Sequence, residues 1–108
     1  MAMVNDAVLN EIWEKAASVS GFNPDRWRKD FAGAWIQRDQ LGIASTFGWE
    51  VCHLVPTSKG GADNVSNLYP IQWENHRMKA NRYPVFKTAV TAEGERNIRQ
   101  EKKWKIQK

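Results

Sequence analysis

The stretch that decides the fold is "WEVCHLVPTSKGGADNVSNLYPIQWENHRMKANRYP", residues 49–84. Residues 49–55 alternate apolar and polar side chains, which predicts a β-strand. Residues 56–67 are rich in Pro, Gly, Ser, Asn and Asp, so they predict a long loop. Residues 68–71 predict a short extended piece, and residues 72–83 predict a helix that the following proline closes.

This segment contains both histidines of the chain and its single cysteine. His53 follows Cys52 at the end of the first strand, Asn67 ends the loop, and His76 lies on the helix. The simplest closure pairs the short strand beside the first one and packs the helix across the pair. We therefore expect a thiol, two imidazoles and an amide to lie within reach of one another.

Such a group of side chains suits the hydrolysis of a phosphodiester. Histidine titrates near neutrality and can take a proton from water. A second imidazole with an anionic neighbour can hold a divalent cation, which stabilises the developing charge and the leaving oxygen. Positive charge for a nucleic-acid backbone comes from Lys59, Arg77, Lys79 and Arg82.

Each of these residues also has a plainer interpretation when it is taken alone. A single helical histidine such as His76 is usually a surface or packed residue, and Asn67 can simply brace a turn. Cys52 by itself is most often a small buried hydrophobe. The "KGG" of residues 59–61 is a turn and not a phosphate-binding Walker loop, whose residue order is absent. Only the joint order and spacing favour a functional site.

Residues 49–84 resemble the HNH endonuclease family, whose fold is the ββα-metal motif. The family pattern has an acidic residue and His at a strand end, a Pro, a "SKGG"-type loop, an Asn-Leu pair, and a helical His or Asn followed by Lys. A looser resemblance extends through the preceding "RKDFAGAWIQRDQ" to small bacterial and phage members. The residues in step with the pattern are His53, Pro56, Ser58, Lys59, Gly60, Gly61, Asn67, Leu68, His76 and Lys79.

The resemblance implies an α+β protein with a ββα-metal core, N-terminal helices and a short β-hairpin, acting as a metal-dependent DNA endonuclease. His53 is then the general base that activates water, Asn67 braces the loop and orients His53, and His76 binds one divalent metal ion, Mg²⁺ or Mn²⁺. The substrate is double-stranded DNA, entered through the minor groove. The phosphate contacts expected on charge grounds are Lys59, Arg77, Lys79 and Arg82.

The chain departs from the family in two ways. Many members hold a structural zinc ion with two Cys-x-x-Cys pairs, whereas this chain has Gln72 and Asn75 at the corresponding helix positions. Cys52 stands where the family usually has Asp, and a soft thiolate favours Zn²⁺. Either Cys52 and His76 bind a softer metal, or Mg²⁺ or Mn²⁺ is held with help from Glu50 on the same strand face, or the site is weakened to a DNA-binding module. We favour the working enzyme.

The rest of the chain is expected to complete one domain of 108 residues. Two N-terminal helices are expected within residues 4–31. Residues 6–19 predict the first helix, because apolar side chains recur every four residues and Asp6 can cap its start. The Asn-Pro pair that begins residues 23–31 predicts a second, short helix.

The core is expected to span residues 33–84. Residues 33–40 predict a strand that pairs antiparallel with residues 49–55. Residues 87–98 predict a final hairpin that turns at a Glu-Gly pair.

The formal net charge is +4, and residues 96–108 contain six basic residues against one acid. This segment is expected to be a basic tail, either solvated or tracking phosphates. A single cysteine excludes an internal disulfide and favours a reducing compartment, with the cytoplasm as the default. The first residues lack the features of a signal peptide, and no apolar run approaches a membrane span. The oligomeric state, monomer or homodimer, stays open.

Overall fold

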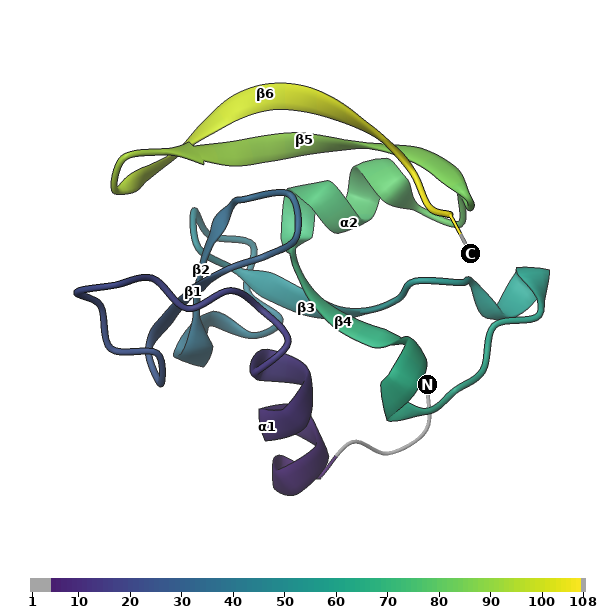
Figure 1. Cartoon of the computed structure of the whole chain (residues 1–108), viewed down its shortest axis with the longest axis horizontal. Helices are drawn as coiled ribbons and strands as arrows, with labels where there is room; N and C mark the ends of the chain where they lie inside the picture. Colours follow the sequence, from purple (N-terminus) through teal and green to yellow (C-terminus); the bar gives the residue numbers. More distant parts are fainter. Residues whose placement is uncertain (1–4, 108) are drawn as a thin grey trace.

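The computed structural model describes residues 5–107, which form an α+β fold with two α-helices and three two-stranded antiparallel sheets (Figure 1). The helices are α1 (Asp6–Trp13) and α2 (Trp73–Lys79). The sheets pair β1 (Trp27–Lys29) with β2 (Trp35–Gln37), β3 (Trp49–His53) with β4 (Leu68–Gln72), and β5 (Val85–Glu93) with β6 (Arg96–Lys105). Three single turns of 3₁₀-helix are η1 (Arg38–Gln40), η2 (Thr57–Lys59) and η3 (Val65–Asn67). The predicted α+β class is confirmed.

The first helix is shorter than the predicted span of 6–19, because α1 ends at Trp13. Its cap is Asn5, whose side-chain oxygen accepts a hydrogen bond from the Val8 N–H at 2.9 Å, rather than Asp6. Beyond the helix, Ala17 pairs with Lys29 through backbone hydrogen bonds. This pairing satisfies backbone groups that a longer helix would have used internally.

The second helix predicted within 23–31 is wrong, since the same segment forms a single turn and then β1. Asn23 closes the turn by accepting from the Arg26 and Trp27 N–H groups. Trp27 then packs edge-on against Trp35 and Phe47, so aromatic contacts favour the strand over the local helical signal.

The predicted pairing of residues 33–40 with 49–55 is also wrong. β2 pairs with β1, and β3 pairs with β4. The segment between β2 and β3 makes a parallel bridge from Leu41 to Trp49, and the Gln37 N–H donates to the Phe47 oxygen. The loop after β3 brings residues 68–72 back beside β3, as the short extended piece predicted.

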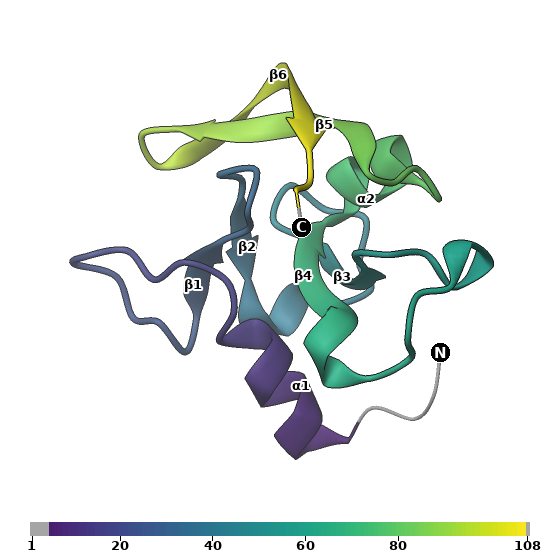
Figure 2. The same cartoon turned by 45° about the vertical axis from the view of Figure 1, so that its right-hand side comes forward.

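Helix α2 lies across the β3–β4 pair and beneath the β5–β6 hairpin (Figures 1 and 2). It covers residues 73–79 and is therefore shorter than the predicted 72–83. Gln72 caps its start by accepting from the Glu74 and Asn75 N–H groups. The chain leaves the helix at Ala80, which has a positive φ of 50°.

The predicted hairpin exists and is longer than expected, and the predicted basic tail is wrong because Arg96–Lys105 form β6. Gly94, with a φ of 61°, makes the turn. Two side chains of β6 bond the body of the protein: Asn97 bonds the backbone of Trp35, and Lys102 donates to the Ala32 oxygen. Within the hairpin, the Trp104 indole donates to the Thr88 hydroxyl of β5.

A buried polar network, Asp30–Gln72–Asn75, joins three segments that are distant in the sequence. Asp30 accepts from the backbone N–H groups of Ala32, Ala34 and Gln72 and from the Asn75 amide, at 2.9–3.1 Å. The Asn75 side chain also bonds the backbone of β5 through the N–H groups of residues 89 and 90 and the oxygen of residue 90. Burial raises the pKa of the Asp30 carboxyl, and its four N–H donors act against that rise.

Candidate active site

His53, at the end of β3, is paired with a carboxylate from the following loop. Its Nε2 lies 2.9 Å from Oδ1 of Asp63, and the two side chains are 19% and 35% exposed. Within residues 5–107, Nδ1 of His53 has no hydrogen-bond partner. The imidazole therefore has one nitrogen oriented by a carboxylate and a partly open ring, which is the arrangement of a general base.

Asn67 braces the loop that carries this pair. Its Oδ1 accepts from the Val55 N–H, and its Nδ2 donates to the oxygens of Val55 and Ala62, all at 2.9 Å. Val55 lies two residues after His53, and Ala62 immediately precedes Asp63. Asn67 thus ties together the two pieces of backbone that hold His53 and Asp63, as the predicted bracing role requires.

The two glycines of the "SKGG" loop are each required, for different structural reasons. Gly60 ends η2 with a φ of 86°, a left-handed conformation that favours glycine. A Cβ on Gly61 would lie 1.7 Å from the Val55 oxygen and 3.0 Å from Nδ2 of Asn67. Gly61 is therefore needed for the loop to close tightly around Asn67.

The second pair joins β3 to α2. Nδ1 of His76 lies 2.7 Å from Oε1 of Glu50, and the side chains are 33% and 36% exposed. Glu50 is thus the anionic neighbour of His76, on the strand face that the alternation predicted. A carboxylate oxygen and an imidazole nitrogen are both ligands for divalent cations, and the pair is open to solvent.

Cys52 lies on the same face as Glu50 but is buried, with 2% exposure. Burial raises the pKa of its thiol to about 11, although the nearby Lys79 ammonium opposes the rise and Glu50 adds to it. The Sγ donates to the His53 oxygen at 3.4 Å. Cys52 is therefore a thiol closed off from solvent and bonded to the backbone, which argues against its predicted role as a metal ligand.

Lys79 was predicted to contact phosphates, and this prediction is wrong. Its side chain is fully buried, with Nζ 3.4 Å from the His53 oxygen and 5.0 Å from the centre of the Phe86 ring. Burial lowers the pKa of its ammonium. Lys79 instead links α2 to the backbone of β3 at the residue that carries the candidate base.

The other predicted cations are exposed. Lys59 lies in η2, Arg77 stacks 4.6 Å over the Trp73 ring, and Arg82 follows α2 and donates to the Met78 oxygen. All three can therefore meet a solvent-borne anion. They belong to three different segments: η2, α2 and the turn that follows α2.

The structure brings the predicted residues together as two separate pairs rather than as one cluster. No hydrogen bond or ion pair joins His53 to His76 or to the Asn67 side chain within residues 5–107. In the same described range, no group of three or more His, Cys, Asp or Glu side chains lies close enough to hold a metal ion. Sequence reasoning missed Asp63, because one acid in a loop of turn-forming residues carries no signal of where the loop will place it.

Comparison of the chain with models of protein families, with curated proteins and with solved structures gives no match in any of the three. The chemistry of the site must therefore be argued from its own residues. Within residues 5–107, no helix is both long enough and apolar enough to cross a membrane.

Proposed function

We propose that this protein is a metal-dependent DNA endonuclease of the HNH type, with β3, β4 and α2 as its ββα-metal core. The observation that carries the proposal is the presence of two half-exposed His–carboxylate pairs on one strand–loop–strand–helix unit. One pair suits proton transfer from water, and the other suits cation binding. Metal-dependent hydrolysis of a phosphodiester can use both.

In this proposal His53 takes the proton from the attacking water. Asp63 holds the ring through Nε2 and stabilises the imidazolium that forms, so Nδ1 is the atom that receives the proton. Asn67 and Gly61 keep the two partners in place, and Lys79 anchors the β3 backbone at His53. The proton is passed on to solvent after the phosphodiester bond has broken.

Glu50 and His76 fit a divalent cation. A hard oxygen with an imidazole suits Mg²⁺ or Mn²⁺, which commonly bind through one or two protein groups together with water and substrate phosphate. When bound, the ion would stabilise negative charge on the scissile phosphate and help the 3′ oxygen to leave. Cys52 is left out of this donor set because its side chain is buried, whereas Glu50 and His76 are open to solvent. Zn²⁺ stays a second choice, since imidazole also suits it.

The proposed substrate is double-stranded DNA, with Lys59, Arg77 and Arg82 as phosphate contacts. These three are exposed cations, and the chain as a whole carries a net charge of +4. One site cuts one strand, so a monomer would nick DNA and a homodimer could cut both strands.

A second candidate function is a DNA-binding module that does not cleave. The observation that favours it is Cys52, a neutral thiol where the family usually has a carboxylate. In that case cations would still bind the backbone, while the two pairs would only hold β3, the loop and α2 together.

The test is cleavage of supercoiled plasmid with EDTA, Mg²⁺, Mn²⁺ or Zn²⁺. We expect nicked product only with a divalent metal, and a loss of about 10²–10⁴-fold in His53→Ala, the size of a general-base contribution. Binding without cleavage in every metal would favour the module. Equal cleavage by wild type and His53→Ala would remove His53 as the base.

A further inference from the structure

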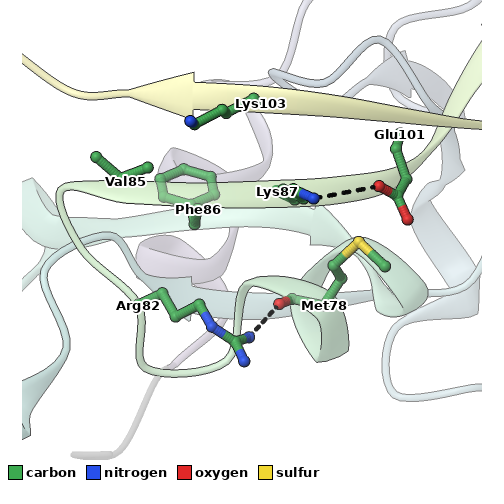
Figure 3. A pocket seen from close by; sticks show the side chains of 7 residues that line it. All are labelled: Met78, Arg82, Val85, Phe86, Lys87, Glu101 and Lys103. Carbon is green, nitrogen blue, oxygen red and sulfur yellow. Dashed lines mark hydrogen bonds and ion pairs between the residues drawn. The ribbon is translucent and has the colours of Figure 1, made fainter.

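Apart from the two pairs, a hollow lies between the C-terminal end of α2 and the β5–β6 hairpin (Figure 3). Its volume of about 430 Å³ falls within the range of small-ligand sites. Met78, Val85 and Phe86 form its apolar part. Val85 is 42% exposed, so an apolar surface is open to an incoming ring.

The rim of the hollow is positively charged. Arg82, Lys87 and Lys103 line it together with one acid, Glu101. In Figure 3 the side chains of Val85 and Phe86 lie between Lys103 on one side and Arg82 on the other. Three cations against one carboxylate make this a site for an anion rather than for a neutral apolar ligand.

The positions of the two lysines, Lys87 and Lys103, destabilise the β5–β6 hairpin. Lys87 and Lys103 are direct register partners across β5 and β6, and like charges directly opposite destabilise a strand pair. Glu101 relieves only part of the repulsion, because it lies 3.7 Å from Lys87 in an exposed pair. Among residues 5–107, Lys103 forms no ion pair. An anionic group between the lysines would remove the repulsion.

We propose that this hollow binds one unpaired nucleotide of a DNA single strand. The base packs on Val85 and Met78 with Phe86 behind them, and the flanking phosphates meet Arg82, Lys87 and Lys103. An apolar surface beside cations is the combination that single-stranded nucleic acid uses, whereas duplex DNA hides its bases and presents mainly phosphates. That the strand is DNA rests on the proposed function. The binding of an unpaired base with its phosphates rests only on the apolar surface and the cationic rim.

The test measures binding of a fluorescein-labelled ten-nucleotide DNA single strand by fluorescence anisotropy, in EDTA and over a range of salt. The site variant is Lys87→Gln with Lys103→Gln, two rim lysines that have no role in the proposed cleavage. The control is Arg26→Gln with Arg96→Gln, two exposed arginines elsewhere. Loss of two phosphate contacts should lower the slope of log affinity against log salt by about 1.4, and the control should leave the slope unchanged. An equal fall in both variants would overturn the proposal.

Two further probes isolate the base. Val85→Ser should weaken binding of the single strand about fivefold, as expected for the loss of one apolar contact with the base, and should not affect an abasic strand of the same length. Equal loss for both strands would overturn the base contact. Binding of a poly-glutamate peptide as tight as that of the single strand would reduce the hollow to a general polyanion surface.

The same measurements separate this site from the proposed cleavage. If no metal supports cleavage but the Lys87/Lys103 variant still loses strand binding, the hollow stands and the nuclease proposal fails. If cleavage is found and strand binding is unaffected in that variant, the nuclease stands and the hollow fails.

Discussion

Two neighbouring residues of helix α2, Asn75 and His76, differ sharply in their exposure to solvent. Asn75 is fully buried and has its amide oxygen and nitrogen satisfied by Asp30 and the β5 backbone. The side chain of His76, the next residue, is about one-third exposed and pairs with Glu50. One step along a helix turns the side chain by about 100°, which is enough to move it from the core to the open face.

The comparison separates structure from chemistry. In the Asp30–Gln72–Asn75 network a carboxylate accepts four N–H donors and is shielded from water, so it can hold elements together but cannot meet a substrate. In the His53–Asp63 and Glu50–His76 pairs the carboxylate side chains are 35% and 36% exposed. Similar groups are structural at one place and available for reaction at the other.

The largest expected effect is on the buried side of the comparison. Asn75→Ala should lower the free energy of unfolding by about 4 kcal/mol, because two buried N–H groups of β5 lose their acceptor at roughly 1–3 kcal/mol each. Urea unfolding measures the loss. The exposed Asn81→Ala serves as control and should change stability by less than about 0.5 kcal/mol. A loss below 1 kcal/mol for Asn75→Ala would show that the network is not a main support of the fold.

On the open side, Asp63→Asn should reduce cleavage about 100-fold, since the imidazolium of His53 loses its anionic partner. Stability should change by less than about 1 kcal/mol, because the pair is partly exposed. Single-turnover plasmid nicking measures the first quantity and thermal unfolding the second. Asp39→Asn removes the same charge from an exposed site and should leave the nicking rate unchanged. A loss of stability without a loss of rate would assign Asp63 to the scaffold.

A smaller effect is expected for Glu50→Gln. Replacing a hard anionic ligand by a neutral amide should raise the Mn²⁺ concentration needed for half-saturation about tenfold, measured by calorimetry on the protein alone. Glu95→Gln, exposed at the hairpin turn, is the matched control. Unchanged Mn²⁺ binding in Glu50→Gln would remove Glu50 from the metal site. The exposed Glu50–His76 pair would then be structural, like the buried network on the other side of α2.

The smallest effect is expected for Cys52→Ala, which should cost about 1 kcal/mol, as for one buried methyl-sized group, and leave metal preference unchanged. The variant also has a pH signature. Because burial raises the thiol pKa from 9.0 to about 11, the folded state keeps a proton that the unfolded chain loses. Wild type should therefore lose stability relative to Cys52→Ala as pH rises from about 9 to about 11. A switch in metal preference would restore Cys52 as a ligand.

The strand–loop–strand–helix order between residues 49 and 79 was predictable, because each part has a strong local signal: alternation, turn formers, and helix formers ended by proline. The length of α1, the nature of residues 27–29 and the partner of β2 were not. Those features depend on contacts between distant segments, such as the packing of Trp27 against Phe47 and the pairing of Ala17 with Lys29.

The candidate site divides in the same way. Glu50 beside Cys52 followed from alternation, and Asn67 as the loop brace followed from the resemblance to the HNH pattern. The position of Asp63 could not be predicted, because no local sequence periodicity indicates the path of the twelve-residue loop 56–67. Lys79 was misplaced because helical spacing puts it beside His76 without saying which of them the hairpin covers.

By itself, therefore, the sequence determined the order of the central elements, the residue types available for proton transfer and cation binding, and the basic charge of the chain. The tertiary structure decided which of those groups are reachable. It buried Cys52 and Lys79, opened His53 and His76, and turned the expected basic tail into β6. The physical reason is that local patterns set backbone conformation and side-chain direction, whereas exposure and pairing depend on which distant surface packs against each face.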